Sequence, residues 1–338
     1  MTGAPAPLLD VTDLTIRLDG AAEPIVEGVS FALQPGETLC LVGESGCGKS
    51  LTALALMGLL TSPPLHVSAG QARFQGADLL AMPPEALRRI RGGRMAMIFQ
   101  EPMSSLNPAL RIGEQIAEAV RVHQGLGQQD ARNRARDMLE RVRIPAASAR
   151  LDEYPHQLSG GMRQRAMIAM ALANDPALLI ADEPTTALDV TIQAQILQLM
   201  RNLSRETGAA LIMITHDLGV VAEMADKVAV MYAGRIVEAG TAAQIFDDPQ
   251  HPYTLGLMSS MPALGGGRDR LVTIPGTVPA PADMPRGCRF AARCAFAGPD
   301  CAERPPLTDL GAGHMAACWR APLETSATAA PLTKGQMA

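Results

Sequence analysis

The sequence has no apolar run of the roughly eighteen residues that a membrane-spanning helix needs. It also has no long basic tract, and its 29 basic and 34 acidic side chains give a formal net charge of −5. This balance lacks the basic footprint of a nucleic-acid-binding protein, so we expect no nucleic-acid partner. The first residues lack the basic and apolar regions of a signal peptide, which predicts a cytoplasmic protein.

What is present suffices for two domains, because the chain has 338 residues and 47% of them are hydrophobic. Alternating apolar and polar residues predict antiparallel strands over residues 8–33 and a hairpin near 72–76. Helical patterns and short apolar strands then alternate between residues 112 and 231, which predicts a parallel α/β sheet. After about residue 262, glycines and prolines mark a linker into a loop-rich tail, whose last residues we expect to be disordered.

One loop fits the phosphate-binding pattern G-x-x-x-x-G-K-[ST] at every fixed position. It consists of Gly43, Glu44, Ser45, Gly46, Cys47, Gly48, Lys49 and Ser50. The glycines let backbone N–H groups converge on phosphate, Lys49 adds a positive charge, and the Ser50 hydroxyl can bind Mg²⁺. A glycine-rich turn could match by accident, but an apolar strand before the loop and a helix after it favour a nucleotide site.

A second apolar strand, residues 178–181, ends in two carboxylates, Asp182 and Glu183. Asp182 suits a direct or water-mediated contact with Mg²⁺, and Glu183 is placed to polarise an attacking water. The alternative is an exposed acidic turn, which the phosphate-binding loop upstream makes less attractive.

The stretch between these two elements reads Leu158-Ser159-Gly160-Gly161-Met162-Arg163-Gln164. Ser159 can cap a following helix, and Gly160 and Gly161 open backbone N–H groups toward an anion, although a helix cap alone would also explain them. Together with the phosphate-binding loop, the stretch resembles the signature LSGGQ of the ATP-binding-cassette (ABC) ATPases, with Met162 in place of the last glutamine.

The resemblance extends to Gln100, to the loop that ends in Asp189 and to His216, all in the family's order. It implies that Gln100 contacts Mg²⁺ and couples the site to a membrane partner, and that His216 contacts the γ-phosphate. It also implies that Ser159, Gly160 and Gly161 complete the site of a facing subunit. The plainer alternatives are an exposed strand end for Gln100, a helix cap for Asp189 and a helix N-terminal residue for His216.

Three further stretches narrow the resemblance to the ATPase subunits of dipeptide and oligopeptide (and nickel) importers. They are residues 99–108, residues 180–191, and His251-Pro252-Tyr253-Thr254 at the start of the C-terminal region. The implied fold is a P-loop ABC cassette: a RecA-like α/β core, an antiparallel β subdomain and an inserted helical subdomain at about 101–173. We expect this cassette to fill residues 1–250, with a small loop-rich C-terminal extension at 251–338.

The resemblance implies that the chain hydrolyses ATP with Mg²⁺ to power import of dipeptides or oligopeptides through a separate transmembrane permease. The implied partners are a second, homologous ATPase in a heterodimer, two permease subunits and an extracytoplasmic solute-binding protein. The chain would then lie peripherally on the cytoplasmic face of the inner (plasma) membrane. Two alternatives stay open: an importer of nickel, glutathione or another small solute, and a soluble ABC ATPase outside transport.

Four cysteines cluster in the tail at Cys288, Cys294, Cys301 and Cys318, without the C-x2-C spacing of zinc ribbons. In a reducing compartment such a cluster suggests a metal site rather than disulfides. The related importers favour a [4Fe–4S] cluster, while zinc and unliganded or disulfide-bonded cysteines remain alternatives. We expect the loss of one thiolate to loosen the tail without affecting Lys49 or Glu183.

Overall fold

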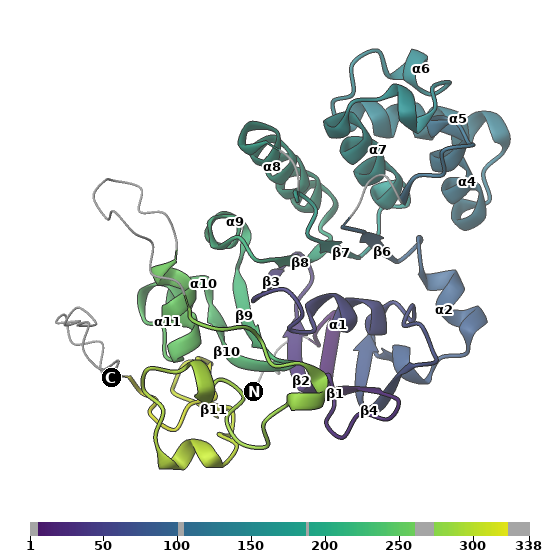
Figure 1. Ribbon diagram of the computed structural model, residues 1–338. Helices are drawn as coiled ribbons and strands as arrows, with labels where there is room; N and C mark the ends of the chain where they lie inside the picture. Colours follow the sequence, from purple (N-terminus) through teal and green to yellow (C-terminus); the bar gives the residue numbers. More distant parts are fainter. Residues whose placement is uncertain (1–5, 101–104, 187–188, 261–273, 324–338) are drawn as a thin grey trace, which may run out of the picture.

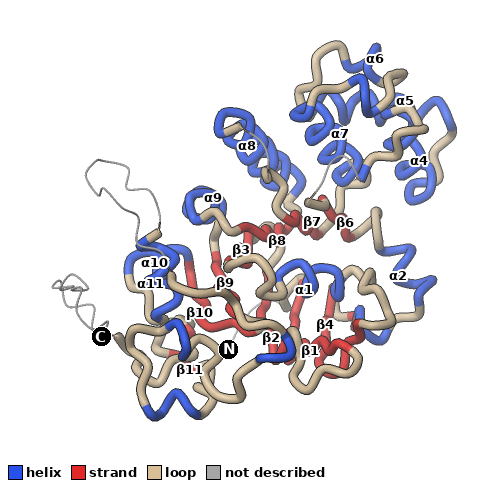
Figure 2. The backbone as a smooth tube through the Cα atoms, in the orientation of Figure 1, coloured by secondary structure: helices blue, strands red, loops and turns tan. Residues whose placement is uncertain are grey.

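The computed structural model describes residues 6–100, 105–186, 189–260 and 274–323. Within these ranges the strands form two sheets, which lie side by side below the helices α4 to α7 (Figure 1). The smaller sheet has four strands in the order β2-β1-β4-β5, and the larger has eight in the order β11-β12-β10-β9-β3-β8-β7-β6. Figure 2 shows the helices gathered around the larger sheet and in a separate group at its β6 end.

The smaller sheet is antiparallel, as the alternating pattern predicted. Its strands are β1 (Leu9–Leu18), β2 (Val26–Leu33), β4 (Leu65–Phe74) and β5 (Ala77–Asp78). The central strand β1 pairs with both β2 and β4. Its apolar side chains Leu9, Val11, Leu14 and Ile16 are buried, and this face packs toward the phosphate-binding loop and helix α1.

The larger sheet holds the parallel strands that the sequence predicted. They are β3 (Thr38–Val42), β6 (Met95–Ile98), β7 (Leu178–Asp182), β8 (Ala210–Thr215) and β9 (Lys227–Tyr232). All residues of β3, β7 and β8 are buried, as expected for parallel strands covered on both faces. Because these strands are parallel, their carboxyl ends meet at one edge of the sheet, where ligands of α/β proteins usually bind.

Helices cover the sheet and form the inserted subdomain. Those near the sheet are α1 (Lys49–Leu56), α2 (Pro84–Ile90), α8 (Val190–Thr207), α9 (Leu218–Met224), α10 (Ala242–Asp247) and α11 (Pro252–Ser259). The subdomain contains α4 (Ile112–Gln124), α5 (Gln128–Arg141), α6 (Ala147–Arg150) and α7 (Gly160–Leu172). In the described part of the chain, no helix is both long enough and apolar enough to cross a membrane.

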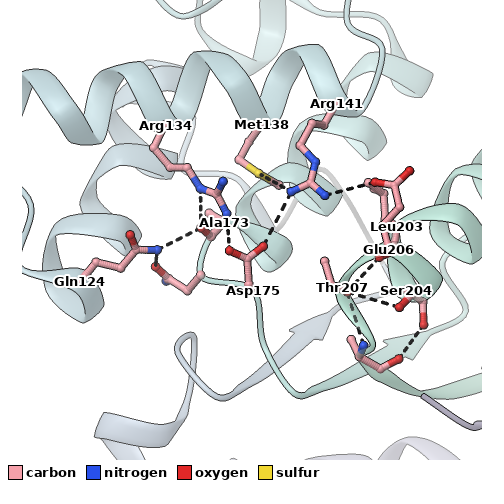
Figure 3. A network of polar contacts seen from close by, with 12 residues as sticks. Gln124, Arg134, Met138, Arg141, Ala173, Asp175, Leu203, Ser204, Glu206 and Thr207 are labelled. Atoms are coloured by element: carbon pink, nitrogen blue, oxygen red, sulfur yellow. Dashed lines mark hydrogen bonds and ion pairs between the residues drawn. The ribbon is translucent and has the colours of Figure 1, made fainter. Parts of the chain in front are cut away.

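A polar network joins the helical subdomain to helix α8 (Figure 3). Arg134 of α5 binds Asp175 at 2.6 Å, just before β7, and Arg141 lies between Asp175 at 3.7 Å and Glu206 of α8 at 3.2 Å. These side chains are partly exposed, so each pair adds little stability. Together these ion pairs connect α5 to α8 and to the residue segment before β7.

The C-terminal extension continues the larger sheet, which the sequence did not predict. Strand β10 (Arg235–Thr241) runs antiparallel to β9, and its other edge pairs with β12 (Met315–Ala316), which in turn pairs with β11 (Thr308–Asp309). The rest of the extension consists of loops and the 3-10 turns at Pro281–Asp283, Ala291–Arg293 and Pro299–Ala302. The predicted linker near residue 265 and the predicted disordered end lie outside the described residues.

Candidate nucleotide site

The phosphate-binding loop connects β3 to α1 as the sequence predicted. Gly46 and Gly48 have φ angles of +81° and +99°, a backbone region that side chains rarely adopt. A Cβ atom at Gly43 would lie 2.1 Å from the Met231 carbonyl oxygen, and one at Gly48 would lie 2.8 Å from Val26. The loop glycines are therefore required by the tight turn and by the close approach of β9 and β2.

Lys49 begins helix α1 and points back into the loop. Its Nζ donates to the carbonyl oxygens of Gly43 at 2.7 Å and Glu44 at 2.9 Å, and the side chain is buried. The Cys47 Sγ lies 3.6 Å from the same Nζ, and burial raises the pKa of this thiol despite the positive charge beside it. The ammonium group is thus held inside the curve of the loop, where bound phosphate would take over its hydrogen bonds.

Ser50 and Asp182 meet across the sheet edge. The Ser50 Oγ donates to Asp182 Oδ1 at 3.0 Å. Burial raises the pKa of Asp182, while the Ser50 hydrogen bond and the Lys49 charge act in the opposite direction. A hydroxyl and a carboxylate are the hard oxygen ligands that Mg²⁺ prefers, and Mg²⁺ usually takes few protein ligands beside substrate phosphates and water. These two residues therefore fit a Mg²⁺ ion that arrives with a nucleotide.

Glu183 lies at the centre of a second polar group. Its Oε2 accepts from Gln100 Nε2 at 3.1 Å and from Thr186 Oγ1 at 2.8 Å, while its Oε1 lies 3.2 Å from His216 Nδ1. Burial alone would raise the pKa of Glu183, but the Thr186 and His216 contacts and the Lys49 charge together hold it below its usual value. The carboxylate is therefore ionised at neutral pH and can accept a hydrogen bond from water.

Strand topology explains this convergence. Gln100 follows β6, Glu183 follows β7 and His216 follows β8, and these three strands are neighbours in the parallel sheet. The structure thus brings together the loop, Ser50, Asp182 and these three residues. Sequence reasoning did not single out Thr186, which lies three residues after Glu183 and binds the same carboxylate oxygen as Gln100.

The signature residues lie elsewhere. Ser159 caps α7 by accepting from the Met162 N–H at 3.4 Å. Helix α7 belongs to the helical subdomain, which lies apart from α1 in Figure 1. A Cβ atom at Gly160 would meet no other atom within 4 Å, so the backbone there faces open space. Asp189 caps α8 by accepting from the Ile192 N–H at 2.9 Å, while Ala187 and Leu188 lie outside the described residues.

The C-terminal extension contacts the phosphate-binding loop directly, which sequence reasoning missed. The Glu44 carboxylate binds the Arg293 guanidinium at 2.7 and 2.9 Å, and the Glu44 N–H donates to Tyr253 Oη at 2.8 Å. One part of the sequence pointed to this contact: the motif His251-Pro252-Tyr253-Thr254, which belongs to the resemblance with the importer ATPases.

The four tail cysteines share one neighbourhood and are all free thiols. Thiolate charge at Cys301 and Cys318 adds to the burial that raises the pKa of Cys288, and backbone N–H groups donate to the sulfurs of Cys294 at 3.3 Å and Cys318 at 3.4 Å. Among the residues that the structure describes, no three His, Cys, Asp or Glu side chains are grouped closely enough to hold a metal ion. The structure thus does not support the expected iron–sulfur cluster.

Comparison with known proteins agrees with this geometry. Residues 26–186 match the family model "ABC transporter", and residues 237–301 match "Oligopeptide/dipeptide transporter, C-terminal region". A protein of Brucella abortus that is named for peptide import and ATP binding is 53% identical over 93% of this chain and 95% of its own length. A similarly named protein of Brucella melitensis is 51% identical over 93% and 97% of the two chains.

Two solved structures share the fold. A dimeric ATP-binding cassette in a post-hydrolysis state, bound to ADP and Pi, aligns with a TM-score of 0.62 and 25% identity, over 69% of this chain and 98% of that one. The cbiO1 protein of Clostridium perfringens, part of the ABC transporter complex cbiONQ, aligns with a TM-score of 0.62 and 26% identity, over 72% and 92% of the two chains.

The chain therefore belongs to the ABC transporter family, and its fold is that of an ATP-hydrolysing cassette. Within that family it groups with the ATP-binding proteins that carry the oligopeptide/dipeptide transporter C-terminal region. The fold class that the sequence predicted is confirmed.

Proposed function

We propose that this chain is the ATP-hydrolysing subunit that powers import of dipeptides or oligopeptides through a separate transmembrane permease. The observation that carries the proposal is the convergence of Gln100, Glu183 and His216 beside the loop that holds Lys49. The names of the relatives and the matched C-terminal region support peptides as the solute.

In the proposed reaction, Lys49 and the loop amides bind the phosphates of ATP. Ser50, Asp182 and Gln100 would hold Mg²⁺, which would supply positive charge to neutralise the charge that develops on the phosphates. Glu183 orients and deprotonates the attacking water, and His216, 3.2 Å from Glu183, contacts the γ-phosphate. Thr186 and Gln100 keep the Glu183 carboxylate oriented by hydrogen-bonding Oε2.

We further propose that the site is completed by a second, homologous ATPase in a heterodimer. The open backbone at Gly160 and the exposed Ser159 support this proposal, because both are free to contact a nucleotide on a facing subunit. In this arrangement ATP joins the two cassettes and hydrolysis separates them, which would drive two permease subunits loaded by an extracytoplasmic binding protein. In such a complex the chain would lie on the cytoplasmic face of the inner membrane.

The test is reconstitution of the chain with its permease and partner ATPase in liposomes, with solute-loaded binding protein outside. We expect dipeptides or oligopeptides to raise ATP turnover and to accumulate with it. Stimulation by Ni²⁺ or glutathione alone would instead support the small-solute alternative. A chain that turns over ATP but joins no permease would support a soluble ABC ATPase.

For the tail, we propose that Cys288, Cys294, Cys301 and Cys318 hold a [4Fe–4S] cluster that staples the extension. All four cysteines are free thiols, and thiolate sulfur is the ligand that an iron–sulfur cluster takes. The described side chains are not grouped closely enough to hold a metal ion, so the proposal rests on the resemblance to the importer ATPases. A cubane cluster accepts sulfur atoms about 6–7 Å apart, whereas one zinc ion needs about 4 Å. Chain purified without oxygen should contain iron and acid-labile sulfide in similar amounts. Colourless protein with one zinc per chain, or with no metal, would refute the cluster.

A further inference from the structure

Glu44 of the phosphate-binding loop is fixed at three points. Its carboxylate oxygens accept from Arg293 Nη1 at 2.7 Å and Nη2 at 2.9 Å, its N–H donates to Tyr253 Oη at 2.8 Å, and its carbonyl accepts from Lys49 Nζ at 2.9 Å. Two of these partners come from the C-terminal region and the third is the phosphate-binding lysine. The position of Glu44 therefore sets the position of one of the two carbonyl groups that hold Lys49.

Arg293 is itself fixed before it reaches Glu44. Its Nε donates to the Pro275 carbonyl at 2.7 Å, and its guanidinium lies 5.6 Å from the ring centroid of Tyr232. The Arg293 side chain is only 7% exposed, against 29% for Glu44. A bidentate arginine–carboxylate pair of this kind is strong and specific in direction, because both N–H groups must align with both oxygens.

An aromatic cluster packs beside the Arg293–Glu44 pair. The Tyr232 and Tyr253 rings lie 4.7 Å apart, and Phe290 of the extension packs on them at 5.1 and 5.4 Å. Tyr232 ends the core strand β9, so the cluster joins core, helix α11 and extension. The segment that carries Arg293 is therefore packed against the core where its guanidinium reaches the phosphate-binding loop.

We propose that Arg293 is a positioning residue for ATP, which holds the phosphate-binding loop in its binding form through Glu44. By this contact the C-terminal extension sets the nucleotide affinity of the cassette. Arg293 directly precedes Cys294, so any change in the four-cysteine region has a short covalent route to the loop. The inference rests on the ATP site and does not depend on which solute is imported.

The test is the variant Arg293→Gln in the full chain, with fluorescent ATP and ADP titrations and steady-state kinetics of the assembled transporter. Removing one partner of a buried charged pair should weaken nucleotide binding and raise KM for ATP about tenfold, while kcat changes less than about twofold. Arg293→Lys keeps the charge but not the two parallel bonds, so we expect an intermediate loss, and this variant carries the test if Arg293→Gln does not fold.

The matched control is Arg304→Gln. Arg304 also joins the extension to the cassette by an ion pair, but its partner is Glu27 of β2 and not the phosphate-binding loop. We expect its nucleotide affinity to stay within about twofold of the unmodified chain. An equal loss in both variants would mean that loosening of the extension is the cause and would overturn the assignment. So would folded Arg293→Gln protein with unchanged affinity.

A double-mutant cycle with Glu44→Gln separates the contact from other roles of either residue. If Arg293 acts through Glu44, adding Arg293→Gln to Glu44→Gln should change nucleotide affinity by less than about twofold. If the two losses simply multiply, Arg293 does not act through Glu44, and the proposal fails.

Discussion

At the residue scale, Lys49 and Glu183 have separate contacts, so we expect substitutions of the two residues to have different effects. Lys49 is held by loop carbonyls, while Glu183 is held by Gln100, Thr186 and His216 at the ends of neighbouring strands. In the proposed reaction, Lys49 binds the phosphates and Glu183 orients the attacking water. Binding and turnover are thus assigned to different side chains.

We expect Lys49→Ala to abolish nucleotide binding or nearly so, because the buried ammonium supplies the charge in the loop. Glu183→Gln should bind ATP normally and lose turnover by about 10² to 10⁴, since an amide cannot take the proton. ATPase assays paired with nucleotide titration decide both points. Unchanged turnover in the Glu183→Gln protein would remove this residue from the mechanism.

Asp182 should show a conflict between function and stability. Its pKa is raised by burial, so its ionised form is costly in the nucleotide-free chain. Asp182→Asn keeps the Ser50 hydrogen bond and removes the charge, which should raise the nucleotide-free melting temperature by about 2 °C. The same variant should lose the additional stabilisation that Mg²⁺ gives with ATP. Thermal scans with and without Mg²⁺ measure both effects, and a lowered melting temperature without nucleotide would contradict the first.

The sequence predicted most of this site because its residues lie in short motifs with flanking strands. It did not predict the Glu44–Arg293 pair, whose partners are 249 residues apart. Glu44 occupies a variable position of the loop pattern, and one arginine in a loop-rich tail has no periodicity that marks it. Only packing of the extension on β9 and α11 brings the two together.

At the scale of elements, helix α11 begins at a buried histidine. His251 Nδ1 accepts from the Tyr253 N–H at 3.0 Å, and burial lowers the pKa of His251 to about 3. The ring is therefore neutral in the folded chain at every pH above that value. The cap also fixes the start of the helix whose Tyr253 reaches Glu44.

This cap predicts a pH dependence of stability. A histidine whose folded pKa lies below its unfolded value of 6.5 stabilises the fold fully above pH 6.5. That contribution falls as the pH drops toward 3, by up to about 1.4 kcal/mol per pH unit, because only the unfolded chain takes up the proton. His251→Asn keeps a capping acceptor and should flatten the slope, which urea unfolding at pH 7.5 and 5.5 would show. The exposed His156→Asn is the control, and an equal effect in both would refute the assignment.

The sequence predicted the strands of the core better than those of the extension. The core strands are continuous apolar runs, and β7 matches the apolar strand expected at residues 178–181. By contrast β11 and β12 have two residues each, too short for any alternation to appear. The position of these two strands is set by contacts with other elements. Glu238 of β10 is fully buried and accepts hydrogen bonds from the Gln250 and His251 N–H groups. The same carboxylate lies 2.9 Å from the ring of His314, which directly precedes β12.

At the scale of the whole molecule, the signature residues lie at the start of α7 in the helical subdomain, whereas the phosphate-binding loop lies between β3 and α1. We therefore expect the purified chain to be largely monomeric with low ATPase activity, and the assembled transporter to be much faster. Sedimentation and steady-state ATPase assays of both forms test this. Equal rates for the isolated chain and the transporter would show that no facing subunit is needed.

The pairing of β12 with β10 covers part of an edge strand, which we expect to limit self-association. Unpaired N–H and C=O groups along an edge strand are a template for pairing with another chain, and proteins blunt such edges with short or covered strands. Here β12 pairs with Glu238 and Ala239 of the seven-residue β10, and the outermost strand on this side of the sheet is the exposed, two-residue β11. A chain shortened after Ser260 should therefore aggregate through β10 rather than merely lose activity, which light scattering at increasing concentration would reveal. The extension that reaches Glu44 of the phosphate-binding loop thus also adds the last two strands on one side of the larger sheet.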